Sequence, residues 1–285
     1  MRESNNGRAA VWQAGRFTWD LSERALVMGI LNVTPDSFSD GGSYRSMDAA
    51  LKHAHSMVAQ GADILDIGGE STRPGSLSVS VEDELSRTIP VIQRICSQID
   101  VAISIDTSKP EVAKAALNAG AAIINDVTGF QNPEMRSLCA QTSCGMVAMH
   151  MQGTPETMQD SPDYRDVVVE VGSYFTSLSE DLVAQGIHPE RVVYDPGIGF
   201  GKSLAHNLTL LRGLSSLRLL GRPLLMGISR KSLIASLLEK PGIENREFPT
   251  VALTAFTRMN GAVIHRVHTV DQNVAALEMV AALGV

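Results

Sequence analysis

The chain has 285 residues, 44% of them hydrophobic and 19% charged, an ordinary composition for a globular protein with a large buried core. Its net charge of −7 argues against nucleic acid or an anionic membrane as the main partner. The three cysteines form no C-x-x-C pair, so we expect reduced thiols in the cytoplasm rather than disulfides or a zinc site. The N-terminus lacks an apolar signal core, and no apolar run approaches the ~18 residues of a membrane span.

The first 25 residues precede the first strong apolar run, and we predict that they form a short β-hairpin that covers the rest. From residue 26 onward a unit recurs, in which a helical stretch ends in Gly and a short apolar run ends in polar residues. Gly suits the position after a helix, and continuous apolar runs indicate parallel strands buried on both faces. The runs lie near 26–31, 62–68, 101–106, 121–126, 145–150, 191–195, 223–228 and 262–267.

Strands that alternate with helices over residues 26–285 predict an α/β protein with a single-domain (β/α)8 TIM barrel. An open, doubly wound parallel sheet is the alternative that the same pattern allows. Pro90 lies inside the helical pattern of residues 81–97 and predicts a kink or a break there.

Catalytic groups of a barrel lie at the carboxyl ends of its strands and in the loops that follow. Nearly every predicted strand of this chain ends in a hydrogen-bonding or charged residue. A single Asp at such a position caps the next helix about as often as it takes part in a functional site. The convergence of all of them on one rim nevertheless favours one polar active site, built from Asn32, Asp66, Asp106, Asn125, Asp126, Met149, His150, Asp195, Ser229, Arg230, Lys231, Arg266 and His268.

Three glycine-rich loops accompany these strand ends. Residues 32–42 and 68–75 are long and polar, which is typical of segments that cover an active site. Residues 196–203 nearly match a phosphate-binding P-loop, but Pro196 replaces its first Gly, so we interpret them as a tight turn that brings Phe200 to a ligand.

Several segments taken together resemble the dihydropteroate synthase family. They include MGILNVTPDSFSDGG at 28–42, GADILDIGGESTRPG at 61–75, SIDTSKP at 104–110 and DPGIGFGK at 195–202. Shorter matches follow at 227–232 and 266–268, so the resemblance runs in order over nearly the whole chain. Two residues depart from the family pattern beside the site. Pro249 stands where Gly is usual, and Thr269 stands where Asp commonly follows the R-x-H motif.

The resemblance implies a Mg²⁺-dependent transferase of folate biosynthesis with a pterin-binding barrel at 26–285. Such an enzyme joins 6-hydroxymethyl-7,8-dihydropterin diphosphate to 4-aminobenzoate, which forms 7,8-dihydropteroate and releases diphosphate. Diphosphate would leave first, so the enzyme would stabilise a cation on the pterin methylene rather than supply a nucleophile. The resemblance also implies a cytoplasmic homodimer and inhibition by sulfonamides that compete with 4-aminobenzoate.

The resemblance assigns roles to individual residues of this sequence. The pterin would be bound by Asp106, Asn125, Met149, Asp195 and Lys231. The 4-aminobenzoate would contact Phe38, Thr72, Arg73, Pro74, Phe200 and Ser232. The diphosphate would contact Asn32, Arg73, Arg266 and His268, with Asn32 as the Mg²⁺ ligand. The catalytic set would be Asn32, Asp36, Lys231, Arg266 and His268.

Two other functions use the same barrel. A pterin-binding methyltransferase domain would share Asp106, Asn125 and Asp195 but needs no diphosphate site, so Arg266 and His268 favour the synthase. A non-catalytic pterin-binding paralogue is the other alternative, although every polar residue that the resemblance requires is present. An assay of product formation with both substrates would separate these functions.

Overall fold

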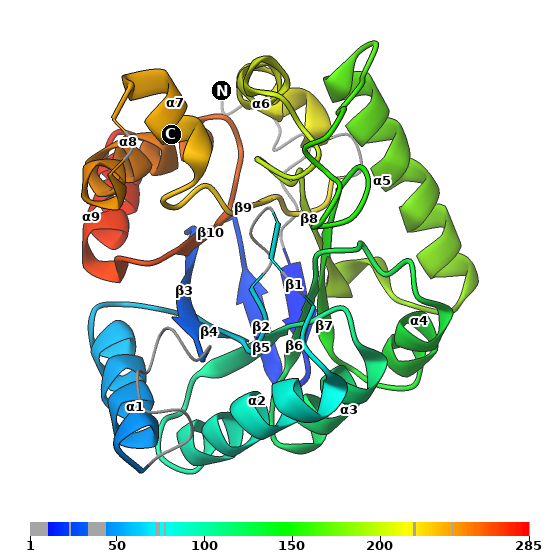
Figure 1. The fold of residues 1–285 in the computed structure, drawn as a ribbon, viewed down its shortest axis with the longest axis vertical. Coiled ribbons are helices and arrows are strands. Elements are labelled where there is room, and N and C mark those ends of the chain that lie inside the picture. The colour runs from blue at the N-terminus through cyan, green and yellow to red at the C-terminus, as the bar shows by residue number, and fades with distance from the viewer. Residues whose placement is uncertain are drawn as a thin grey trace.

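The architecture is an eight-stranded parallel barrel with helices around it (Figure 1). The computed structural model describes residues 11–22, 24–33, 44–71, 75–76, 78–218, 221–240 and 242–284, without the side chains of 44–46. The strand order is β8-β7-β6-β5-β4-β3-β10-β9. Tyr194 then pairs with Leu224 and donates its backbone N–H to Pro223 O at 3.0 Å, which brings β8 and β9 together and nearly closes the barrel. The predicted barrel is confirmed.

The barrel strands agree with the predicted apolar runs to within about three residues at each end, as expected of pattern-based boundaries. They are β3 (Leu26–Asn32), β4 (Ile64–Gly68), β5 (Ala102–Asp106), β6 (Ile123–Asp126), β7 (Gly145–Met149), β8 (Val192–Asp195), β9 (Leu225–Met226) and β10 (Ile264–Val267). All of their residues are buried except Asn32 and Arg266, which are partly exposed at the rim.

The helices pack their apolar sides on the outside of the barrel. They are α1 (Tyr44–Ala59), α2 (Val81–Cys96), α3 (Pro110–Asn118), α4 (Pro133–Ala140), α5 (Val167–Ala184), α6 (Leu204–Arg212), α7 (Ser232–Leu238), α8 (Glu247–Met259) and α9 (Val270–Ala282). Helix α2 continues through Pro90, so the alternative of a break there is wrong. Pro90 is exposed, and water can bond the carbonyl group that its missing N–H leaves without a partner. In the described chain no helix is long and apolar enough to cross a membrane.

The predicted hairpin is present and closes the amino-terminal end of the barrel. Strands β1 (Val11–Ala14) and β2 (Phe17–Asp20) pair antiparallel. Trp12 is fully buried in one apolar cluster with the first residues of the barrel strands, and its indole N–H donates to Arg191 O at 3.1 Å. Ala14 lies so close to Gly145 that a side chain at 145 would meet its Cβ at 2.6 Å. The hairpin therefore leaves the carboxyl-terminal rim as the open end.

Candidate active site

A partly buried arginine lies at the centre of the rim. Arg266 of β10 donates from Nε to Asp66 Oδ2 at 2.6 Å and from Nη2 to Asp106 Oδ2 at 2.7 Å. Asn125 donates from Nδ2 to the same Asp66 oxygen at 3.2 Å. Burial lowers the pKa of Arg266, but the two carboxylates more than offset this and raise it overall, so the guanidinium stays charged. The barrel register thus brings four side chains from β4, β5, β6 and β10 into one contact set.

Two carboxylate oxygens in this set still lack a donor. Asp66 Oδ1 and Asp106 Oδ1 are buried and have no hydrogen-bond partner among the described residues. Burial raises the pKa of Asp106, an effect that the Arg266 charge opposes and the neighbouring Asp66 charge reinforces. An unpartnered buried acceptor is costly, so these oxygens are suited to a ligand that offers N–H groups.

A second cluster lies across the rim on β8 and the start of α7. Asp195 Oδ1 accepts a hydrogen bond from the Gly197 N–H at 2.8 Å. Lys231 donates to Ile198 O, and its ammonium lies 4.2 Å from the centre of the Phe200 ring. Burial lowers the pKa of Lys231 to about 8, while the Asp195 charge opposes the shift. Burial raises the pKa of Asp195, and Lys231 opposes it. A mixed pair of this kind can both donate to and accept from one planar ligand.

Residues 196–203, which nearly match a P-loop, are held in place by the lysine of the same segment. Lys202 Nζ lies within 2.9 to 3.3 Å of Phe200 O, Gly197 O and His150 O, and 3.0 Å from His150 Nδ1. Burial lowers the pKa of His150 to about 3, so its ring is neutral and can accept. A Cβ at Gly197, where φ is +67°, would meet His150 O at 1.9 Å, so this turn requires Gly. The segment therefore forms a tight turn, as predicted, and its lysine bonds the backbone carbonyls of that turn and of His150.

His268 is oriented by a serine. Ser229 Oγ lies 2.9 Å from His268 Nδ1 and accepts the backbone N–H of His268 at 3.2 Å. If the hydroxyl donates to Nδ1, the proton of the neutral ring lies on Nε2. Thr269, one of the two departures, is the N-cap residue of α9, and its hydroxyl accepts from Arg230 Nη2 at 3.1 Å. Pro249, the other departure, lies in the first turn of α8, where proline is tolerated.

The remaining predicted residues divide into two groups. Asn32 ends β3 and is partly exposed, Met149 is buried at the end of β7, and Ser232 is exposed as the first residue of α7. The other predicted residues lie outside the described part of the chain: Asp36, Phe38, Thr72, Arg73 and Pro74. Within the described ranges, no group of three or more His, Cys, Asp or Glu is placed to hold a metal ion.

Three residues of the site had no assigned role before the structure. Asp66 was noted only as a strand end, although its place two residues after Ile64 on the same face pointed into the barrel. Lys202 and Ser229 act through residues that are distant in sequence, which no local pattern reveals. A cavity of about 280 Å³ also opens beside Asp106, between the segments that follow β4, β5, β6 and β7.

Known proteins share this fold and much of this sequence. The family described as "Pterin binding enzyme" matches residues 28–268. The dihydropteroate synthase of Escherichia coli K12 is 48% identical over 256 residues, which cover 90% of each chain. A Yersinia pestis dihydropteroate synthase, solved as a complex with a sulfonamide drug, has a TM-score of 0.90 at 46% identity and covers 96% of this chain and 99% of its own. The Burkholderia cenocepacia dihydropteroate synthase complexed with 7,8-dihydropteroate has a TM-score of 0.87 at 42% identity and covers 96% of each chain.

Proposed function

Because the chain belongs to the dihydropteroate synthase family, the transferases of folate biosynthesis, we propose that its rim binds 6-hydroxymethyl-7,8-dihydropterin diphosphate and 4-aminobenzoate. The reaction joins the amine of 4-aminobenzoate to the pterin methylene and releases diphosphate. The observation that supports this most strongly is the contact set of Asp66, Asp106, Asn125 and Arg266, with two buried carboxylate oxygens that no described residue bonds.

The pterin suits these groups because one edge of its ring carries N–H donors next to acceptors. Asp106 and Asn125 would bond that edge from one side of the rim, and Asp195 from the other. Lys231 would donate to the acceptor side of the ring, and Met149 would line the pocket. A site with buried polar groups rejects ligands that leave those groups unpaired, which explains selectivity for this ring.

Chemistry at this rim needs charge stabilisation rather than a nucleophile. As diphosphate leaves, positive charge develops on the exocyclic methylene and spreads into the ring. The negative carboxylates of Asp106 and Asp195 would stabilise this charge. The aryl amine of 4-aminobenzoate is neutral at cytoplasmic pH and attacks without a strong base. Phe200, Ser232 and the undescribed Phe38, Thr72, Arg73 and Pro74 would hold this second substrate.

The diphosphate would be bound at the end of β10. Arg266 uses two of its five N–H donors on Asp66 and Asp106, which leaves three for an anion. His268 follows directly after the strand, where Ser229 Oγ lies 2.9 Å from its Nδ1. Together with Arg73, these residues would stabilise the negative charge of the leaving group. Asp36 would steady the charge on the methylene.

Magnesium fits this site as an ion that arrives with the diphosphate. Asn32 offers an amide oxygen at the end of β3, and Mg²⁺ is commonly held by one or two protein oxygens together with substrate phosphates. When bound, the ion would neutralise charge on the leaving diphosphate. Asn32 would hold it there, and the diphosphate would supply further oxygen ligands.

An assay with both substrates tests the proposal. We expect one 7,8-dihydropteroate and one diphosphate for each pair of substrates consumed, as measured by chromatography. Asp106→Ala and Asn125→Ala should fold but lose pterin affinity in calorimetry. Binding of the pterin without product would indicate a non-catalytic paralogue, and methyl transfer from a folate would indicate the methyltransferase alternative. Sulfonamides should inhibit in competition with 4-aminobenzoate.

We further propose a homodimer in the cytoplasm. Helices α8 and α9 leave large apolar side chains on the surface, with Phe248 84%, Met279 62% and Leu283 74% exposed. Leu277 and Val280 of α9, by contrast, are buried within this chain. Exposed apolar side chains of this kind favour association. Light scattering of the purified protein, with Phe248→Asp as the disrupted variant, tests it.

A further inference from the structure

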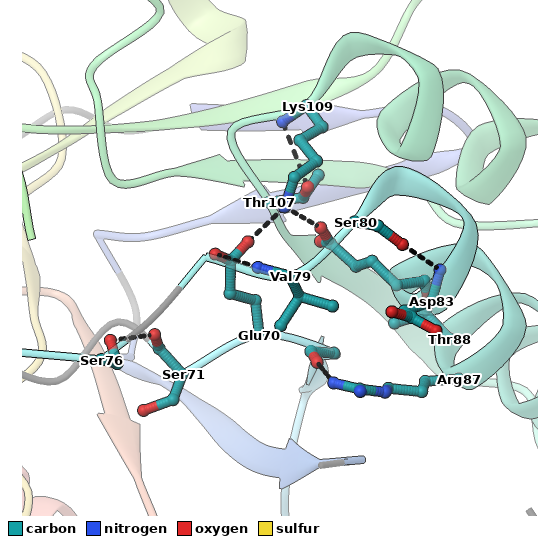
Figure 2. A network of polar contacts seen from close by, with 12 residues as sticks. Glu70, Ser71, Ser76, Val79, Ser80, Asp83, Arg87, Thr88, Thr107 and Lys109 are labelled. Atoms are coloured by element: carbon teal, nitrogen blue, oxygen red, sulfur yellow. Dashed lines mark hydrogen bonds and ion pairs between the residues drawn. The ribbon is translucent and has the colours of Figure 1, made fainter.

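A second polar network lies beside the active site, where the loop after β4 meets the first turns of α2 and α3 (Figure 2). Lys109, the residue before α3, donates to Glu70 Oε2 and also to Glu84 Oε2 at 2.6 Å. Glu70 lies in the β4–α2 loop, which the structure describes at 69–71, 75–76 and 78–80. Glu84 lies in the first turn of α2. One lysine therefore joins a loop to two helices.

The network is built for a charged lysine. The Glu84 side chain is fully buried, and those of Lys109 and Glu70 are each 20% exposed. Burial lowers the pKa of Lys109, but the hydrogen bonds to Glu70 and Glu84 more than offset this and raise it overall. Lys109 makes no side-chain bond to cap its own helix, so its side chain serves the loop. Removing its charge would leave two acidic groups against each other in a buried place.

The same network holds both ends of the loop. Glu70 Oε1 accepts the backbone N–H of Val79 at 3.1 Å, so one carboxylate joins the start of the loop to its end. Arg87 of α2 donates to Gly69 O at 3.0 Å just before Glu70. Gly75 donates its backbone N–H to Pro155 O at 3.4 Å, which ties the loop to the segment after β7. The described parts of the loop are thus bonded on both sides of residues 72–74.

The loop also forms a wall of the active site. Glu70, Ser71 and Ser76 line the cavity of about 280 Å³ that Asp106 lines from the neighbouring strand β5. Thr72, Arg73 and Pro74, which the resemblance assigns to 4-aminobenzoate, follow Ser71 in the sequence. Asp106, by contrast, is held by its strand and by Arg266. A shift of the loop would therefore affect the two substrates unequally.

We propose that Glu70, Lys109 and Glu84 are positioning residues, a latch that holds the β4–α2 loop where 4-aminobenzoate binds and leaves pterin affinity to the barrel strands. The proposal rests on the proposed function for its choice of substrate. Glu70 and Lys109 line the cavity, but their charged groups are bonded to each other, to Glu84 and to the Val79 N–H. The latch acts by holding the two described ends of the loop, at Glu70 and Val79, in place before 4-aminobenzoate binds.

Glu70→Gln tests the latch with little risk to folding. Glutamine keeps an oxygen for the Val79 N–H, and the buried pair of Lys109 and Glu84 stays neutral overall. We expect KM for 4-aminobenzoate to rise about fivefold, the upper range for a partly exposed ion pair, with kcat and KM for the pterin diphosphate unchanged. Glu82→Gln is the matched control, because Glu82 lies in the first turn of α2 near Glu84 but is exposed and does not line the cavity. All of its kinetic constants should stay at wild-type values.

Hydrogen exchange without substrates provides a second measurement that does not depend on activity. In Glu70→Gln the amides of residues 75–80 should exchange faster than in the wild type, while those of α2 and α3 keep their rates. Lys109→Arg should retain slow exchange, and Lys109→Met should lose it.

Equal increases in both KM values, or a lower melting temperature with uniform exchange, would show a merely structural role and overturn the proposal. Unchanged KM and unchanged exchange would overturn it as well. If the wild type formed no product but the exchange result held, the proposed function would be wrong and the latch would remain.

Discussion

The two ends of the barrel are made by the same strands, and a step of two residues separates them. Ile64, Ile123 and Val193 lie in the apolar cluster beneath the hairpin. Two residues later, on the same face of each strand, come the polar residues of the rim, which are Asp66, Asn125 and Asp195. Ile264 and Arg266 of β10 follow the same rule.

This difference shows which end of the barrel contributes to the stability of the fold and which end lowers it. At the closed end every side chain of the cluster removes apolar surface from water, which contributes to stability in proportion to the area buried. At the open end Asp66 and Asp106 are buried with oxygens that no described residue bonds, which costs free energy until a ligand arrives. Changes at the open end should therefore alter chemistry, and changes at the closed end should alter stability alone.

Arg266→Met should have the largest effect, because it removes the cation that both carboxylates share. We expect kcat/KM to fall by about 10²–10³-fold, the range for loss of one donor that stabilises developing charge. The free energy of unfolding should also fall, by ~3–5 kcal/mol, because two buried carboxylates lose their partner. Arg266→Lys keeps the charge without the two-pronged geometry, so it should recover stability more than activity. Rates of product formation and urea unfolding measure the two effects, and Arg266→Met with near wild-type rates would contradict the assignment.

Trp12→Ala should have the opposite profile at the closed end. Loss of a fully buried tryptophan should lower the free energy of unfolding by ~3–5 kcal/mol. The folded enzyme should keep its kcat and both KM values at a temperature where it remains folded. Trp19→Ala is the matched control, since Trp19 lies 5.1 Å from the Trp12 ring but is partly exposed, and it should cost less. A change in pterin affinity in either variant would show that the two ends are coupled.

The strand ends were the part of the site that could be predicted from sequence. Asp106, Asn125 and Asp195 follow continuous apolar runs, and the parallel register brings them to one rim. The pairing of Arg266 with two carboxylates could not be predicted, because it depends on the side-chain geometry between β10, β4 and β5. Lys202 was hidden for a related reason, since its local motif suggested phosphate while its partners are backbone carbonyls and His150.

Lys231 should make the activity at the open end depend on pH. Burial lowers the pKa of its ammonium to about 8, so the cation is present below that pH and is lost as the pH rises through it. If the charge is needed at the open end, kcat/KM should fall above about pH 8, because this ratio reports the free enzyme. In Lys231→Arg the fall should move above pH 10, since a guanidinium keeps its proton there. A fall at the same pH in both proteins would assign it to another group.

Substitution of His265 should have the smallest effect, and it should change stability but not activity. It alternates with Arg266 on β10, so it faces the outer core instead of the site, and it is almost fully buried. Burial lowers the pKa of His265 from 6.5 to about 3, with the Arg258 charge acting in the same direction. The unfolded chain therefore binds a proton at His265 near pH 6.5 that the folded chain refuses, and stability is lost as the pH falls between these two values.

The difference in proton binding sets the slope of stability against pH. In the pH range well below 6.5 but above the pKa of the folded state, each such histidine lowers the free energy of unfolding by ~1.4 kcal/mol for each unit that the pH falls. His150, with its pKa near 3, contributes a second slope of the same sign. His265→Leu removes one of these two contributions. Between pH 5.5 and pH 4.5 the free energy of unfolding, measured with urea, should therefore fall by ~1.4 kcal/mol less in the variant than in the wild type. An equal slope in His265→Leu and in the wild type would mean that His265 is charged in the folded protein.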